Sequence, residues 1–438
     1  MREDLFEHQR VGARKLAGRQ RVLLADEPGL GKSRTALLAA KLNDGNGNIV
    51  VICPAIMRTQ WYREAEAVGL VPMVDVVVMS YSGAMLKGQD ALYAELQSAC
   101  TIILDEVHAL KNMGAKRTQM LLGAASPVRS APYVYALSGT PLPKGDPAEL
   151  WPLMASLFPG VAVHYGCRTL KQWQERFCVV QGRMVRGHWV DKTVGVKNAP
   201  LLRELLRKVM LRRTVQDVGL SLPPIVWQRE ALAWGPPMDA QLSTEHEALA
   251  RAVEGATQAE LDLLEKDPEV ARVRRKLGLF KVPAILDYLR TQLEGSPERL
   301  VVFSYHRDVL RVLHDSLEDD GYAVVSVDGS TPQGRRDAAI RAFQSPEKSA
   351  PRVFLGQIDA CKEGITLTAA RRVILAEPSW TASTNLQAAH RVARIGQTAN
   401  VTFAVMLALA NTLDDAVVGQ HYRELRQHRE VFAEGAAQ

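Results

Sequence analysis

The chain has 438 residues, of which 47% are hydrophobic and 23% charged, values typical of a folded protein with more than one hydrophobic core. It contains no run near the roughly 20 apolar residues of a membrane span, and its first residues carry two acids where a secretory signal would be apolar. We therefore expect an intracellular protein without a membrane span. The net charge of +6 is compatible with a polyanionic partner but does not require one, and the five scattered cysteines predict neither a zinc site nor a disulfide framework.

Short apolar runs alternate with helical stretches through the first part of the chain. The runs cover residues 22–25, 49–52, 74–79, 101–104 and 133–137. This alternation is typical of a parallel sheet covered by helices, and it predicts an α/β domain over residues 1–235. An insertion is expected at about residues 155–200. Within it, three glycines interrupt short runs between residues 181 and 198, which predicts a small β-hairpin.

The same alternation returns toward the carboxyl end, with apolar runs at residues 300–303, 323–327, 352–355, 373–375 and 401–405. These runs predict a second α/β domain over residues 296–438. Residues 241–292 are highly charged, contain Ala-, Glu- and Leu-rich stretches, and hold few glycines or prolines. We therefore predict a helical connector over residues 236–295.

The first signal for function is the sequence Asp26-Glu-Pro-Gly-Leu-Gly-Lys-Ser33, which follows a predicted strand and opens a predicted helix. Glycine permits the backbone conformations that close N–H groups around a phosphate, and the helix N-terminus adds positive potential. We predict that Lys32 meets the β- and γ-phosphates of ATP and that Ser33 meets Mg²⁺. The remaining residues of this predicted nucleotide site are Gly29, Leu30, Gly31 and Arg34. Asp26 stands where the strict G-x-x-x-x-G-K-[ST] pattern has its first glycine.

Two neighbouring carboxylates, Asp105 and Glu106, come directly after the apolar run 101–104. Ligands of parallel α/β sheets bind beyond the carboxyl ends of the strands, so this pair is expected beside the phosphates. Asp105 would hold Mg²⁺ directly or through water, and Glu106 would orient or deprotonate the attacking water. An acidic surface turn is the alternative interpretation.

Two arginines in the second domain, Arg391 and Arg394, are candidate arginine fingers. Their i, i+3 spacing would place both guanidinium groups on one face of a helix, from which they could reach phosphates bound by the first domain. Hydrolysis would then require domain closure. A solvated basic helix face is the alternative.

Together these motifs resemble the superfamily-two helicase motor, and their residues resemble most those of its Swi/Snf branch. The shared strings are Asp26-Glu-x-Gly-Leu-Gly-Lys32, Asp105-Glu-x-His108, Ser138-Gly-Thr-Pro141 and Arg391-x-x-Arg-Ile-Gly-Gln397, with weaker matches at His8-Gln9, Cys53-Pro-Ala55, Gln60-Trp61, Leu211-Arg-Arg213, Leu222-Pro-Pro224, Phe303-Ser-Tyr-His306, Asp328-Gly-Ser-Thr-Pro332 and Gly364-Ile-Thr-Leu367. Lys281-Val-Pro-Ala-Ile285, the Asp328 string and the hairpin are similar to the annealing-helicase, or HARP-type, subgroup. The departures from the pattern are Pro28, Val107 and the pair Lys362 and Glu363 before Gly364.

The resemblance implies an α/β fold with two RecA-like parallel-sheet domains in tandem, a helical connector and a small hairpin insertion. It implies that Gln9 reads adenine and that both domains grip duplex DNA, mainly through its phosphates, so binding should depend on salt more than on sequence. Candidate phosphate contacts are Arg58, Lys111, Asn112, Thr331 and Thr366, each of which could instead be an ordinary polar surface residue. The hairpin adds Arg183, Arg186 and Trp189, a mixture suited to a DNA junction, unless Trp189 only packs onto its own domain.

The expected function is ATP-dependent translocation on double-stranded DNA, with strand annealing or fork remodelling as its output. A strand-separating DNA or RNA helicase is an alternative, because the motor chemistry is shared. A nucleotide-gated DNA-binding scaffold is a third interpretation, against which the complete set of ATP-site residues counts. We expect a monomer that meets duplex, forked or junction DNA and a recruiting protein partner. We expect it in the cytoplasm as a bacterial or phage-encoded protein, or in the nucleus if it is eukaryotic.

Overall fold

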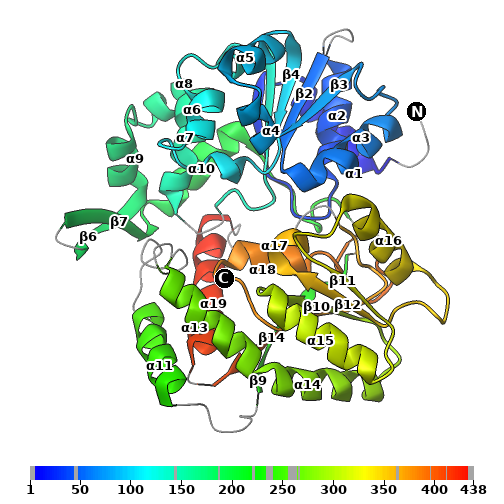
Figure 1. Cartoon of the computed structure of the whole chain (residues 1–438). Coiled ribbons are helices and arrows are strands. Elements are labelled where there is room, and N and C mark those ends of the chain that lie inside the picture. The colour runs from blue at the N-terminus through cyan, green and yellow to red at the C-terminus, as the bar shows by residue number, and fades with distance from the viewer. Residues whose placement is uncertain are drawn as a thin grey trace. The chain divides into compact units, whose positions relative to one another are not determined.

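The computed structural model describes residues 5–43, 48–142, 146–185, 188–219, 222–232, 240–254, 264, 267–361, 365–394, 396–410 and 412–432. The chain divides into two compact units, whose main bodies are residues 1–221 and residues 222–426. Each unit is built on a six-stranded sheet whose strand pairings are all parallel (Figure 1). No helix within these ranges is long and apolar enough to cross a membrane.

The first unit has the strand order β3-β2-β4-β5-β1-β8. Its strands are β1 (Arg21–Leu24), β2 (Asn48–Cys53), β3 (Val76–Ser80), β4 (Ala99–Leu104), β5 (Tyr133–Leu137) and β8 (Met210–Leu211). Side chains alternate between two apolar clusters, as the pleat of a strand requires: in β1, Leu23 enters one cluster while Val22 and Leu24 enter the other. Both faces of this sheet are therefore buried, which is why its strands read as nearly continuous apolar runs.

Helices cover both faces of the first sheet. One face packs against α1 (Glu7–Ala17), α2 (Lys32–Leu42) and α3 (Arg58–Ala67). The other helices of the unit are α4 (Tyr81–Leu86), α5 (Gln89–Gln97), α6 (Lys116–Leu122), α7 (Trp151–Leu157), α8 (Pro159–His164), α9 (Leu170–Phe177) and α10 (Ala199–Val209), which contribute to the cluster on the opposite face. The predicted hairpin is confirmed as the antiparallel pair β6 (Cys178–Val185) and β7 (His188–Val196).

The second unit has the strand order β11-β12-β10-β13-β14-β9. Its strands are β9 (Ile225–Leu232), β10 (Leu300–Ser304), β11 (Val324–Val327), β12 (Val353–Gln357), β13 (Arg372–Leu375) and β14 (Thr402–Leu409). Its helices are α11 (Ala240–Glu254), α13 (Pro268–Phe280), α14 (Val282–Gly295), α15 (Arg307–Asp319), α16 (Gln333–Gln344), α17 (Ile358–Cys361), α18 (Ala382–Ala389) and α19 (Leu413–Phe432). Two apolar clusters again flank the sheet, one on each face.

The boundary between the units lies at residues 221 and 222 rather than near residue 235. The physical reason is β9, which pairs with β14 along its whole length and so belongs to the second sheet. The predicted connector is helical where it is described, but α13 and α14 bury Leu277, Ile285 and Leu289 in the core of the second unit. Most of this segment is therefore part of a domain rather than a free link between two.

Candidate nucleotide and nucleic-acid site

The phosphate loop has the backbone that the glycine pattern predicts. Gly29 and Gly31 have φ values of 94° and 76°, in the left-handed region that other residues rarely adopt. A Cβ at Gly31 would lie 2.3 Å from Gln9 Nε2, so a side chain there would be strained by the backbone and would displace the Gln9 amide. Gly31 caps the amino end of α2, whose first residue is Lys32, and this places the first N–H groups of the helix at the loop.

Helix α1 lies against the same loop. The His8 ring Nε2 is 2.9 Å from the carbonyl oxygen of Leu30, and the Gln9 amide approaches the same oxygen at 3.5 Å. Both side chains are more than nine-tenths buried. The predicted adenine reader, Gln9, is therefore adjacent to the phosphate loop.

Asp26, which replaces the first glycine of the strict pattern, anchors this arrangement. Its fully buried carboxylate accepts two hydrogen bonds from Arg213, from Nε at 3.1 Å and from Nη2 at 2.5 Å. Arg213 Nη1 also donates to the carbonyl oxygen of His8 at 2.5 Å. A Cβ at Gly12 would lie 2.5 Å from Arg213 Nη2, so this glycine makes room for the guanidinium. One arginine thus ties together α1, the phosphate loop and the segment after β8.

Lys32 lies beside the loop that follows β5. Its Nζ donates to the carbonyl oxygens of Asp26, at 2.9 Å, and of Glu27, at 3.4 Å. A Cβ at Gly139 would be 3.2 Å from the same nitrogen, so Gly139 allows the Ser138-Gly-Thr segment to approach the ammonium group closely. The Lys32 side chain therefore lies along the phosphate loop.

Asp105 is held by two aromatic side chains. Trp61 Nε1 donates to its Oδ2 at 2.8 Å, and the backbone N–H of Glu106 donates to Oδ1 at 3.0 Å. The Tyr81 hydroxyl donates to the backbone carbonyl oxygen of Asp105 at 2.7 Å. Burial, followed by the negative charge of Asp105, raises the pKa of Tyr81 well above its ordinary value, so this hydroxyl remains a donor. The carboxylate is fixed at the end of β4 before any ligand arrives.

Glu106 has a φ of 46°, a conformation that costs a non-glycine residue about 1–3 kcal/mol and is common at functional sites. Its Oε2 lies 3.2 Å from His108 Nδ1, and the same nitrogen lies 3.4 Å from Ser138 Oγ. His108 therefore connects the carboxylate pair after β4 with the segment after β5, which also borders Lys32. Three loops at the carboxyl edge of one sheet are joined by contacts between neighbours.

These residues fit a magnesium ion that arrives with its nucleotide. Within the described ranges, no group of three or more His, Cys, Asp or Glu side chains could hold a metal by itself. The Asp105 carboxylate, oriented by Trp61 and by the N–H of Glu106, is an oxygen donor of the kind that Mg²⁺ or its water prefers. Mg²⁺ in proteins is usually held through one or two carboxylates together with phosphates and water. Asp105 and the Ser33 hydroxyl, at the first turn of α2, supply donors of this kind.

Arg391 and Arg394 converge on one carbonyl group in the second unit. Arg391 Nη1 is 3.3 Å and Arg394 Nη1 is 3.1 Å from the oxygen of Ile365, and Arg394 Nη1 also donates to Thr366 Oγ1 at 3.1 Å. The prediction that both lie on a helix is wrong, because α18 ends at Ala389 and the chain continues in turns. The two side chains are brought together by a shared acceptor rather than by helical spacing.

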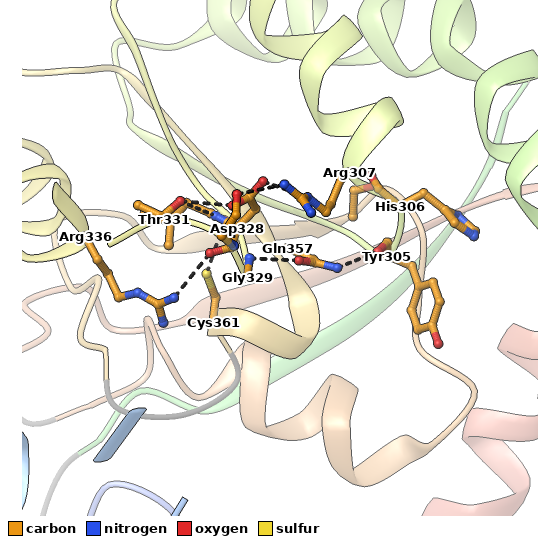
Figure 2. A network of polar contacts seen from close by, with 12 residues as sticks. Tyr305, His306, Arg307, Asp328, Gly329, Thr331, Arg336, Gln357 and Cys361 are labelled. Carbon is orange, nitrogen blue, oxygen red and sulfur yellow. Dashed lines mark hydrogen bonds and ion pairs between the residues drawn. The ribbon is translucent and has the colours of Figure 1, made fainter. Parts of the chain in front are cut away.

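Three loops also meet at the carboxyl edge of the second sheet, as Figure 2 shows. The Asp328 carboxylate accepts bonds from Thr331 Oγ1 at 3.1 Å and from Arg307 Nε at 2.9 Å. Burial alone would raise the pKa of Asp328, but bonds from Ser330, Arg307 and Thr331 lower it below its ordinary value. The predicted phosphate contact Thr331 is therefore part of an ordered loop.

Comparison with known proteins identifies these two units. The SNF2-related domain family matches residues 68–234, and the helicase conserved C-terminal domain family matches residues 281–396. The chain belongs to the Swi/Snf-like family of superfamily-two helicases. The two matched domains are the halves of a helicase-like ATPase core, so the fold predicted from the sequence is confirmed.

Relatives of this Swi/Snf-like core include the Bos taurus "DNA annealing helicase and endonuclease ZRANB3", which is 27% identical over 92% of this chain. The Caenorhabditis elegans "SWI/SNF-related matrix-associated actin-dependent regulator of chromatin subfamily A-like protein 1 homolog" is 28% identical over 95% of this chain. The chain spans 38% and 60% of the lengths of these two relatives. The structure of the "Sulfolobus solfataricus SWI2/SNF2 ATPase core in complex with dsDNA" aligns with 99% of this chain and 98% of that chain, at 19% identity and a TM-score of 0.42. The expected likeness to annealing helicases is confirmed by relatives that carry that name.

The other predicted residues of the Swi/Snf-like core have varied surroundings. Arg34 Nε pairs with Glu64 Oε2 at 2.7 Å, and Lys111 Nζ pairs with Glu149 Oε1 at 2.6 Å. Arg58 is exposed at the start of α3, and Asn112 is exposed with its Oδ1 accepting from the N–H of Gly114. The hairpin side chains Arg183, Arg186 and Trp189 lie outside the described side chains.

Sequence reasoning did not assign roles to the groups that hold the site together. Arg213 and Trp61 were noted only as parts of family strings, and Gly12 and Tyr81 were not singled out. Gly12 carried a usable signal, because a glycine inside a helical stretch often marks close approach by another group. The others carried none, since their partners are distant in the sequence.

Proposed function

We propose that this chain is an ATP-dependent motor that translocates on double-stranded DNA. The observation that carries the proposal is the junction of three loops at the edge of the first sheet, where His108 links Glu106 to Ser138 and the Ser138 loop borders Lys32. Phosphoryl transfer requires a cation that binds the phosphates and carboxylates that act on Mg²⁺ and water. Lys32 and the pair Asp105 and Glu106 supply these groups, and the Ser138 segment is joined to both.

Each residue of the first unit has a role in this proposal. The N–H groups at Gly29, Leu30 and Gly31 cradle the phosphates, and Lys32 exchanges its carbonyl partners for the β- and γ-phosphate oxygens. Glu106, oriented by His108, accepts the proton of the attacking water. Bound Mg²⁺ would neutralise phosphate charge, held by Asp105 and Ser33.

Arg391 and Arg394 are proposed to stabilise charge on the transferring phosphoryl group from the second unit. Their shared acceptor, the Ile365 carbonyl, supports a paired role because one shift of that segment would move both guanidinium groups. Closure of the two units would then be required for turnover, and this requirement is how hydrolysis drives motion along DNA.

The nucleic-acid partner is proposed to be DNA, which a relative's name, DNA annealing helicase, supports, and the resemblance to the Swi/Snf branch favours the duplex form. Arg58, Lys111, Asn112, Thr331 and Thr366 are the proposed phosphate contacts. Lys111 would have to leave Glu149, and Thr366 would have to leave Arg394, or each would have to share that partner. We expect a monomer acting in the cytoplasm of a bacterial cell or in a nucleus, with a partner protein for recruitment.

Strand annealing or fork remodelling is the proposed output, with the hairpin as the junction reader. Replacing Arg183, Arg186 and Lys192 by alanine should reduce activity on forked DNA more than hydrolysis on plain duplex, because the motor's own track is left intact. Equal losses on both substrates, or none on either, would show that the hairpin does not read junctions.

The experiment that tests the proposal compares ATP hydrolysis with duplex DNA, single-stranded DNA, forked DNA and RNA at one salt concentration. Duplex DNA should raise the turnover rate by about tenfold or more, and Lys32→Ala should remove turnover while leaving DNA binding without nucleotide intact. Stimulation by single strands or RNA alone would instead indicate a strand-separating helicase. DNA binding without stimulation would indicate a scaffold.

A further inference from the structure

Arg336, on α16, bridges two loops of the second sheet from a buried position. Its Nη1 donates to the carbonyl oxygen of Ala360 at 2.9 Å, and its Nη2 donates to the carbonyl oxygen of Asp328 at 3.2 Å. The residue is only 6% exposed. Figure 2 shows its guanidinium directed at the Asp328 loop, with Cys361 beside it.

The loop on one side of Arg336 is internally ordered. The Asp328 carboxylate accepts from the N–H of Ser330 at 2.8 Å, in addition to Thr331 and Arg307, and the N–H of Gly329 donates to Gln357 Oε1 at 3.0 Å. The polar groups of this segment bond within the loop, to Arg307 and to Gln357 of β12, so these contacts hold it together as one piece. The Asp328 carbonyl, bound by Arg336, is one of its attachments to the rest of the unit.

The chain on the other side of Arg336 leads to the paired arginines. Cys361 ends α17, and its Sγ donates to the Val327 carbonyl oxygen at 3.7 Å. Burial raises the pKa of the Cys361 thiol to about 12, while the positive charges of Arg336 and Arg391 oppose this rise. A few residues later, the Ile365 carbonyl accepts from both Arg391 and Arg394.

We infer that Arg336 is a positioning residue that holds the Asp328–Thr331 loop and α17 as one body, so that DNA contact at the loop sets the placement of Arg391 and Arg394. A guanidinium suits this role because its fixed fork of donors reaches two carbonyl groups at once. A lysine ammonium is a compact point charge without this fixed fork, so it would hold the two carbonyl groups in a less defined geometry. The inference rests on the proposed function, because it assumes hydrolysis that DNA stimulates.

The test uses Arg336→Lys and Arg336→Gln in the full chain, with Arg335→Ala as the matched control on an exposed neighbour in α16. Turnover is measured against duplex concentration, and duplex binding without nucleotide is measured by fluorescence anisotropy. Both Arg336 variants should lower the maximal duplex-stimulated rate by about tenfold, while the half-saturating DNA concentration changes by less than about threefold. The control should retain the maximal rate within about twofold. If Arg336→Gln fails to fold, Arg336→Lys alone carries the test.

Two results would overturn the inference. One is a folded Arg336→Lys variant whose maximal rate and half-saturating DNA concentration both equal the wild-type values, which would leave Arg336 without a role in coupling. The other is an unchanged maximal rate with a large rise in half-saturating DNA concentration, which would make Arg336 a DNA contact. A wild-type protein that duplex DNA does not stimulate is a separate outcome, because it would refute the proposed function before any variant is compared.

Discussion

Trp61→Phe should show whether ATP hydrolysis depends on the orientation of the Asp105 carboxylate and not only on its presence. The substitution removes an indole N–H that donates to Asp105 Oδ2 at 2.8 Å in a fully buried position. A hydrogen bond to a charged group contributes about 1.5–3 kcal/mol, and the smaller ring also leaves a cavity, so the loss of stability should be about 2–4 kcal/mol. Because Asp105 is the proposed Mg²⁺ ligand, the half-saturating Mg²⁺ concentration for ATP hydrolysis should rise as well.

Tyr81→Phe is the matched control, since its hydroxyl donates at 2.7 Å to the backbone carbonyl of Asp105 and not to the carboxylate. It should cost about 1 kcal/mol of stability and leave the Mg²⁺ dependence close to that of the wild type. Urea unfolding and hydrolysis rates across a Mg²⁺ titration measure both effects. An unchanged Mg²⁺ dependence in Trp61→Phe, or an equal shift in both variants, would show that the Trp61 hydrogen bond does not orient Asp105 for Mg²⁺.

Three further changes have defined outcomes. Arg394→Ala should lower the turnover rate by about two orders of magnitude or more while ATP binding to the first unit weakens far less, as fluorescent-nucleotide titration and steady-state rates would show. Burial, with a contribution from Glu149, raises the pKa of Asp146 to about 6, so ionisation of this carboxyl destabilises the fold as pH rises from about 4 to 6. Asp146→Asn should therefore have a free energy of unfolding up to about 3 kcal/mol higher than the wild type at pH 7.5, and nearly the same value near pH 4. Urea unfolding measures this difference. Burial opposes ionisation of Glu377, but the hydrogen bond and charge of His306 lower its pKa to about 2. The free energy of unfolding of the wild type should therefore fall by on the order of 3 kcal/mol as pH falls from about 4.5 toward 2. Glu377→Gln should lack this dependence, which a series of unfolding curves in that range would show.

The strands were predictable where the local pattern is strong. Ten apolar runs read from the sequence coincide with strands, because both faces of each sheet are buried and the runs are nearly continuous. Two strands were missed. Met210–Leu211 is too short to form a pattern, and Ile225–Leu232 contains Gln228, Arg229 and Glu230, so only its pairing with β14 reveals it. The two strands of that pairing lie at opposite ends of the second unit's sequence, so no local pattern predicts it.

The chemistry of the site was predictable, but its supports were not. The phosphate loop and the carboxylate pair are local strings at strand ends, where position follows from the fold class. The groups that orient them come from afar: Trp61 lies 44 residues before Asp105, and Arg213 lies 187 residues after Asp26. The i, i+3 spacing of Arg391 and Arg394 also predicted a helix at these residues, but α18 ends at Ala389. Both side chains instead donate to the Ile365 carbonyl oxygen.

The most direct test of the central claim is displacement of a third strand from a triplex on a long linear duplex. A motor that moves along double-stranded DNA should release the third strand in a manner that requires ATP, without separating the duplex strands, and Lys32→Ala should release none. Duplex-stimulated hydrolysis without third-strand release, or release that accompanies strand separation, would contradict translocation on the intact duplex.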